Sequence, residues 1–93
     1  MISEIEFHED AEKEFKEASA FYAIEEQSLA LAFVGAAEQT VSRIADHPES
    51  SPLVAGRVRR MRVHRFPYSV LYSVLPDLMR TIAVAHERRR PFY

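Results

Sequence analysis

Residues 57–75 read RVRRMRVHRFPYSVLYSVL, and two adjacent strands predicted within this stretch decide the fold. The first, over 58–64, alternates between apolar and basic side chains, which point to opposite faces of a strand. Its basic face carries Arg60, Arg62 and His64. The second, over 68–75, is rich in the aromatic and β-branched residues that strands favour. Phe66-Pro67 connects them, so we expect neighbouring antiparallel strands.

The segments on either side of this stretch add further strands and a helix. A third strand is expected over 80–86, after a Pro76-Asp77 turn in which proline supplies the φ angle of a type I turn. Within residues 3–7, acidic and apolar side chains alternate, which predicts a short strand with one face exposed to solvent. Apolar residues then recur at helical spacing over about 8–25, which predicts an amphipathic helix.

A second helix is expected after the first, so that the two form a helical hairpin. It is expected to begin at Ser28, whose side chain can cap it, and to end near Asp46, because the following His47-Pro48 disfavours helical geometry. We expect close packing of the two helices at Gly35, since glycine in an exposed helix costs about 1 kcal/mol relative to alanine. Residues 49–56 are expected to form a loop. The order is β-α-α-β-β-β, an α+β fold in which an antiparallel sheet packs in two layers against an N-terminal helical hairpin.

Composition limits the class of protein. A chain of 93 residues forms one domain, 1–93, because a second core would not fit. Its longest apolar run, residues 29–37, is shorter than the roughly 20 residues of a membrane span. The absence of cysteine excludes disulfides, thiolate catalysis and Cys-based metal sites, and the four histidines lack zinc-ligand spacing. We expect no metal, no cofactor, no signal peptide, no membrane partner and a cytoplasmic protein.

The charges are divided between the two halves of the chain. Residues 1–49 hold twelve acidic and three basic groups, a formal charge of −9, whereas residues 50–93 hold nine arginines and two acidic groups, a formal +7. Arginine favours planar, bidentate contacts with phosphate or carboxylate. The second half therefore indicates an anionic partner that meets one face of the molecule. A solvated sheet face, partly covered by the chain's own glutamates, is the alternative.

Two sets of candidate residues follow. The partner-binding candidates are Arg60, Arg62, Arg65, Arg88, Arg89, Arg90 and Tyr93. Metal-free RNA cleavage would need a general base, a general acid and cations near the cleaved phosphate. The candidates for that chemistry are His64, His86, Arg62, Arg89 and Tyr93. His86 is more simply a hydrogen-bonded structural residue, because nothing in the sequence brings these groups together.

Two motifs point to a family. Residues 65–72, RFPYSVLY, contain a basic-Phe-Pro-Tyr-x-x-x-Tyr pattern, and residues 85–91, AHERRRP, contain His-x-x-Arg-x-Pro. Together with the β-α-α-β-β-β order, they resemble the ParE-like branch of the RelE/ParE toxin superfamily of bacterial type II toxin–antitoxin systems. The resemblance covers nearly all of the chain.

The resemblance implies a growth-inhibiting toxin, of the kind associated with plasmid stabilization, that binds and inhibits DNA gyrase or a related target. It also implies a cognate antitoxin that forms a hetero-oligomer with the toxin and inserts apolar side chains between its helices and sheet. RelE-like members instead cut mRNA on the ribosome, and they carry an arginine directly after the tyrosine that begins the third strand. Ser69 occupies that position here, which favours the ParE-like binder. A homologue that only binds its antitoxin is the third possibility.

Overall fold

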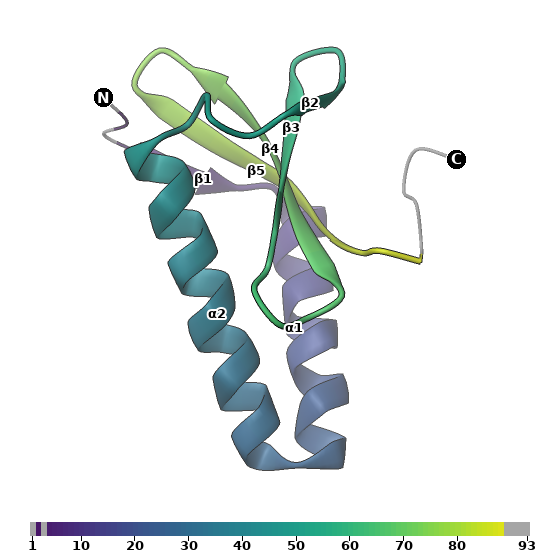
Figure 1. Cartoon of the computed structure of the whole chain (residues 1–93). Helices are drawn as coiled ribbons and strands as arrows, with labels where there is room; N and C mark the ends of the chain where they lie inside the picture. The colour runs from purple at the N-terminus through teal and green to yellow at the C-terminus, as the bar shows by residue number, and fades with distance from the viewer. Residues whose placement is uncertain (1, 3, 89–93) are drawn as a thin grey trace.

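The computed structural model describes residue 2 and residues 4–88, and it confirms the predicted α+β class. The elements are β1 (Glu4–Phe7), α1 (Glu9–Glu25), α2 (Gln27–Asp46), β2 (Leu53–Ala55), β3 (Val58–Arg62), β4 (Tyr68–Leu75) and β5 (Leu78–His86). The two helices form a hairpin that packs on one face of the sheet, and the free end of the hairpin extends past the sheet (Figure 1).

The sheet has five strands in the order β1-β5-β4-β3-β2. The pairs β2–β3, β3–β4 and β4–β5 are antiparallel, but β1 runs parallel to β5, so the expectation of a wholly antiparallel sheet is wrong at this edge. Hydrogen bonds from the Glu4 N–H to the Asp77 carbonyl (3.1 Å) and from the His8 N–H to the Thr81 carbonyl (2.8 Å) fix the parallel register. Alternation over four residues can indicate which face of a strand is exposed to solvent. It does not indicate whether the strand runs parallel or antiparallel to its neighbour.

Two local expectations are also corrected. The expected loop over 49–56 contains β2, whose three residues are all exposed and therefore carry no pattern of buried positions. Ser28 does not cap α2: the N-cap is Glu26, and the Ser28 hydroxyl donates to the Glu26 carboxylate (2.9 Å). The end of α2 at Asp46 matches the expectation, because His47 leaves helical geometry before Pro48.

The core lies between the helical hairpin and the sheet. Phe33 on α2 is fully buried, and its ring contacts Phe66 and Tyr68 at centroid distances of 5.2 Å each. Val70 and Tyr72 of β4 face the same core. Burial of these apolar side chains is the main force that holds the two layers together.

The edge of β5 beyond β1 is closed by a side chain from α1. β1 pairs with β5 only as far as Thr81, and the Glu14 carboxylate accepts the N–H of Val84 (3.0 Å). Burial raises the pKa of Glu14, the hydrogen bond from Val84 lowers it, and nearby Asp10 and Glu17 raise it further. A raised pKa means that the folded state prefers the protonated carboxyl. The associated stability is complete below the unfolded-state pKa of about 4.3 and is lost as pH rises through the folded-state value.

Gly35 does not mark a close contact. A Cβ built at this position meets nothing within 4 Å, so the predicted tight packing of the helices there is wrong. We predict that Gly35→Ala stabilises the fold by about 0.5–1 kcal/mol, because alanine restricts the unfolded chain and favours the helix. Urea unfolding monitored by circular dichroism measures the change. A loss of stability would contradict the open environment seen at Gly35.

Glu14→Gln keeps the acceptor for the Val84 N–H but does not titrate. We predict that this variant gains stability relative to the parent as pH rises from about 4 to 7, because only the parent must ionise a half-buried carboxyl. Unfolding midpoints across that range provide the measurement, and parallel pH profiles for the two proteins would contradict it. As a control, Glu14→Leu removes the acceptor and should cost about 1–3 kcal/mol at both ends of the range.

Candidate functional site

The face of the sheet opposite the helices carries the candidate arginines. In the β3–β4 register, Arg60 pairs with Leu71 and Arg62 pairs with Ser69, whereas Met61 pairs with Val70 of the core. Alternate residues point to opposite faces, so Arg60 and Arg62 share the open face, as the sequence predicts. We call the side of the sheet that bears Arg60 and Arg62 the arginine face.

His64 does not extend this row. β3 ends at Arg62, and His64 lies with Arg65 in an exposed turn. Arg65 adopts a φ angle of 73°, in the left-handed region that most side chains avoid. The turn therefore takes both side chains out of the strand's alternation.

Arg62 is already paired within the molecule. Its Nε lies 2.9 Å from Oε1 of Glu87, which follows β5 directly. The backbone N–H of Glu87 also donates to the Pro67 carbonyl, at 2.8 Å. Glu87 thus connects the end of β5 to both β3 and the β3–β4 turn, and its charge offsets that of Arg62. The sequence did not indicate a role for Glu87, because the two paired residues are 25 positions apart and no local pattern relates them.

Two other arginines have internal partners. Nη1 of Arg59 donates to the carbonyls of Glu49 (3.1 Å) and Ser51 (2.6 Å), and so fastens the segment before β2 to β3. Arg80 pairs with Glu6 across the β5–β1 ladder, with Nε and Oε1 2.8 Å apart. The Arg80–Glu6 pair is partly exposed and therefore contributes little to stability. Glu6 nonetheless offsets the charge of Arg80, whereas the carbonyls that Arg59 contacts carry no net charge.

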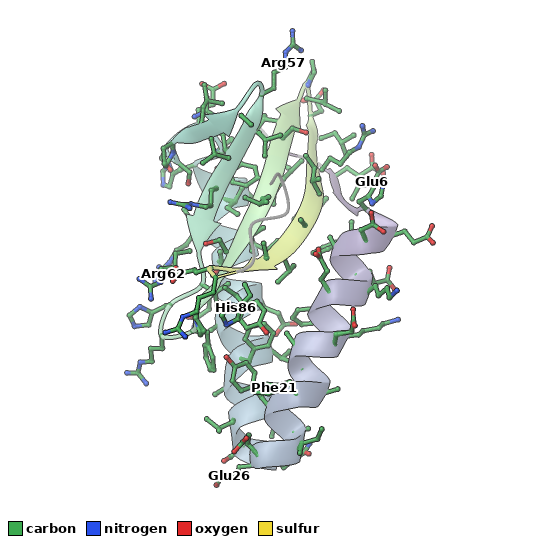
Figure 2. The ribbon with its side chains drawn as sticks, turned by 90° about the vertical axis from the view of Figure 1, so that its right-hand side faces the viewer. Glu6, Phe21, Glu26, Arg57, Arg62 and His86 are labelled. Atoms are coloured by element: carbon green, nitrogen blue, oxygen red, sulfur yellow. The ribbon has the colours of Figure 1, made fainter. Side chains whose placement is uncertain are left out.

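Among the arginines of residues 50–93, four described side chains have no hydrogen bond or ion pair with another side chain or carbonyl in the part of the chain that the structure describes. These are Arg57, Arg60, Arg65 and Arg88. Arg57 lies at the exposed turn between β2 and β3, far from the free end of the helical hairpin (Figure 2). It was not among the predicted site residues, although its place in the run of five arginines was the available signal.

His86 faces the other side of the sheet. An extra residue at Ile82 shifts the β4–β5 register, so His86 pairs with Tyr68. The two rings meet edge to face with centroids 5.0 Å apart. Nδ1 of His86 accepts the backbone N–H of Arg88 at 3.1 Å. This is the structural role that the sequence suggested.

The nuclease candidates are therefore not brought together within the described residues. His64 lies in a turn, Arg62 lies on the arginine face, and His86 packs against Tyr68 on the helix side. The remaining predicted site residues lie outside the described part of the chain. These are Arg89, Arg90 and Tyr93.

A groove of about 480 Å³ opens between the two helices on the helix side of the sheet. Its lining is mostly apolar, with Val70 and Val84 from the sheet and Val34 and Val41 from α2. The charged side chains among its lining residues are Glu12, Lys16 and Glu38. Val34 and Val41 lie seven positions apart on one side of α2, a second apolar stripe that could have indicated the groove.

Other kinds of site find no support in residue 2 and residues 4–88. These residues contain no group of three His, Cys, Asp or Glu side chains placed to hold a metal ion. None of the helices there has the length and apolar character needed to cross a bilayer. Tyr22 packs against the core, and burial raises the pKa of its hydroxyl, with a smaller contribution from Tyr68.

Comparison with known proteins identifies the family. The model of a family described as ParE toxin of type II toxin-antitoxin system, parDE, matches residues 5–91. The chain belongs to the ParE toxin family. A solved structure described as "Chromosomal ParDE TA system from P. aeruginosa" is similar in fold, with a TM-score of 0.80 at 17% sequence identity. The match covers 92% of this chain and 96% of that chain. No match was found among curated protein sequences.

Within this ParE-family chain, Arg59 and Arg60 are neighbours with different predicted roles. We predict that Arg59→Ala destabilises the fold by about 1–2 kcal/mol, because it removes two charge-assisted hydrogen bonds to carbonyls. Arg60→Ala should change stability by less than about 0.5 kcal/mol, since its side chain is exposed and unpaired among the described residues. Urea unfolding of the two variants provides the comparison. Equal losses would show that Arg60 also supports the fold.

Proposed function

We propose that this chain is the toxin component of a type II toxin–antitoxin system and that it binds and inhibits DNA gyrase or a related target. Membership of the ParE family supports this. The observation that carries the choice of a binder over a nuclease is the composition of the arginine face. Ser69 pairs with Arg62 on one side and with Ala85 on the other, so small uncharged residues stand at the position where the RelE-like branch carries an arginine.

Endonuclease activity of the RelE type is the alternative, and the location of the histidines argues against it. Acid–base catalysis needs its groups within hydrogen-bond reach of one substrate. The described candidates instead lie on two faces of the sheet and in an exposed turn. The Nδ1 atom of His86 accepts the N–H of Arg88, and its ring packs edge to face against Tyr68.

The antitoxin is the proposed second partner. The apolar groove between the helices fits the insertion of apolar side chains from a partner segment, because 480 Å³ is enough for several of them. The unpaired arginines fit an acidic part of the same partner. Antitoxin neutralisation would then take place in a hetero-oligomer. Because gyrase and the ribosome are both intracellular, the proposed place of action is the cytoplasm.

The first test separates the three activities. We predict that expression of the chain arrests growth and inhibits gyrase supercoiling without creating new mRNA 5′ ends. Arg60→Ala combined with Arg65→Ala should weaken supercoiling inhibition at least about tenfold, because two exposed cations that make charge-assisted contacts are lost. New mRNA 5′ ends would favour the nuclease. No growth arrest, with a stable antitoxin complex, would favour the homologue that only binds its antitoxin.

A groove variant is the matched control for the arginine pair. Val34→Lys places a charge in the apolar groove, where Glu38 one turn away can balance it. It should weaken antitoxin binding and leave supercoiling inhibition unchanged. Measuring antitoxin affinity at low and high salt checks the electrostatic part: an affinity that does not change with salt would rule out the acidic contact.

A further inference from the structure

In the ion pair between Glu87 and Arg62, the carboxylate of Glu87 binds Arg62 as a carboxylate of a partner would. A carboxylate oxygen of Glu87 lies 2.9 Å from Nε of Arg62, at hydrogen-bond distance, and both side chains are substantially exposed, at 36% and 65%. An exposed pair of this kind is weak and can be replaced by another carboxylate without disturbing the core. Its geometry shows which chemistry Arg62 accepts when a partner is near.

The neighbouring surface fits an extended chain. Arg60 is two residues before Arg62 on the same strand and the same face, so the two positions are about 6.6–6.8 Å apart. An extended partner segment repeats its side chains at the same interval. Acidic residues at alternate positions of such a segment would therefore meet Arg60 and Arg62 together. Ser69, which pairs with Arg62, and Ala85, which pairs with Ser69, have short side chains, whereas the side chain of Arg62 itself is 65% exposed.

We propose that Glu87 is an internal competitor that occupies Arg62 until a carboxylate of an extended, acidic protein segment replaces it. Arg60, which has no partner among the described residues, is the first contact, and displacement of Glu87 adds the second. The inference rests on the proposed function only for the identity of the segment, which would be an antitoxin tail. The competition itself depends on the three residues Arg60, Arg62 and Glu87.

Displacement of the Glu87 side chain leaves the backbone around it in place. The backbone N–H of Glu87 still bonds to the Pro67 carbonyl, and the N–H of Arg88 bonds to His86. These contacts hold the backbone when the Glu87 side chain leaves Arg62. The exchange is therefore confined to one side chain, which allows Glu87 to set affinity without acting as a support for the fold.

The test is a titration of the isotope-labelled protein with a defined probe, the capped peptide Glu-Thr-Glu-Thr-Glu-Thr, followed by NMR at the backbone amide signals of β3, which every variant retains. Glu87→Gln should bind the peptide about two- to fivefold more tightly than the parent, because the peptide no longer competes with an internal carboxylate. High salt should remove the difference. Adding Arg62→Gln to Glu87→Gln should abolish the gain.

Glu6→Gln is the matched control, because it frees Arg80 from a similar exposed pair near the β1 edge of the sheet. It changes the net charge as Glu87→Gln does, and it should leave peptide affinity unchanged. An equal gain in Glu6→Gln, or no gain in Glu87→Gln, would overturn the proposal. A gain that is seen with inorganic pyrophosphate but not with the peptide would overturn it in favour of a phosphate ligand. A chain that fails to arrest growth would refute the toxin function and leave this result unaffected.

Discussion

The contact that organises this molecule is the burial of the Phe33 ring between its two layers. Phe33 is fully buried, and its ring lies 5.7 Å from Phe15 and 5.3 Å from Tyr22 of α1. On the sheet side it lies 5.2 Å from both Phe66 and Tyr68. Aromatic pairs at these distances contribute beyond the area that they bury. One residue of α2 thereby fixes both the hairpin and the position of the β3–β4 turn.

The placement of the turn determines the surface behind it. Phe66 and Tyr68 are held in the core, so Pro67 between them presents its carbonyl to Glu87, and Ser69 is turned to the opposite face. The arginine face is thus a consequence of core packing. A cluster of arginines repels itself, and the chain reduces that cost by pairing Arg62 and Arg80 with glutamates. The alternative interpretation of the sequence was a solvated sheet face that the chain's own glutamates partly cover. It describes these two arginines correctly.

The features that the sequence predicted are those with a local cause. The helices follow from apolar periodicity, and the end of α2 follows from Pro48. Arg60 and Arg62 share a face because a strand alternates. Strict alternation along β5 would place His86 on the same face of the sheet as Arg80, six residues earlier. The extra residue at Ile82 shifts the alternation, so the residues after it point to the opposite faces from those expected. Nothing in the amino-acid pattern of β5 marks that irregularity.

The features that were missed depend on segments distant in sequence. Glu87 meets Arg62 only after β5 has paired with β4, and β4 with β3. β2 is defined by its pairing with β3, and Arg59 holds the segment before it in place. The Gly35 prediction failed for a different reason, since an exposed helical glycine and a packed one look the same in sequence. Tertiary contacts, which local propensity does not encode, decide all of these.

The two surfaces set a geometric requirement for any partner that occupies both of them. The groove and the arginine face lie on opposite sides of one sheet, and the shortest principal extent of the molecule is 22 Å. An extended chain advances about 3.3–3.6 Å per residue, so roughly seven residues match the shortest extent of the molecule. A partner that occupies both surfaces therefore has to reach around the sheet, with an apolar part for the groove and a separate acidic part for Arg60 and Arg62.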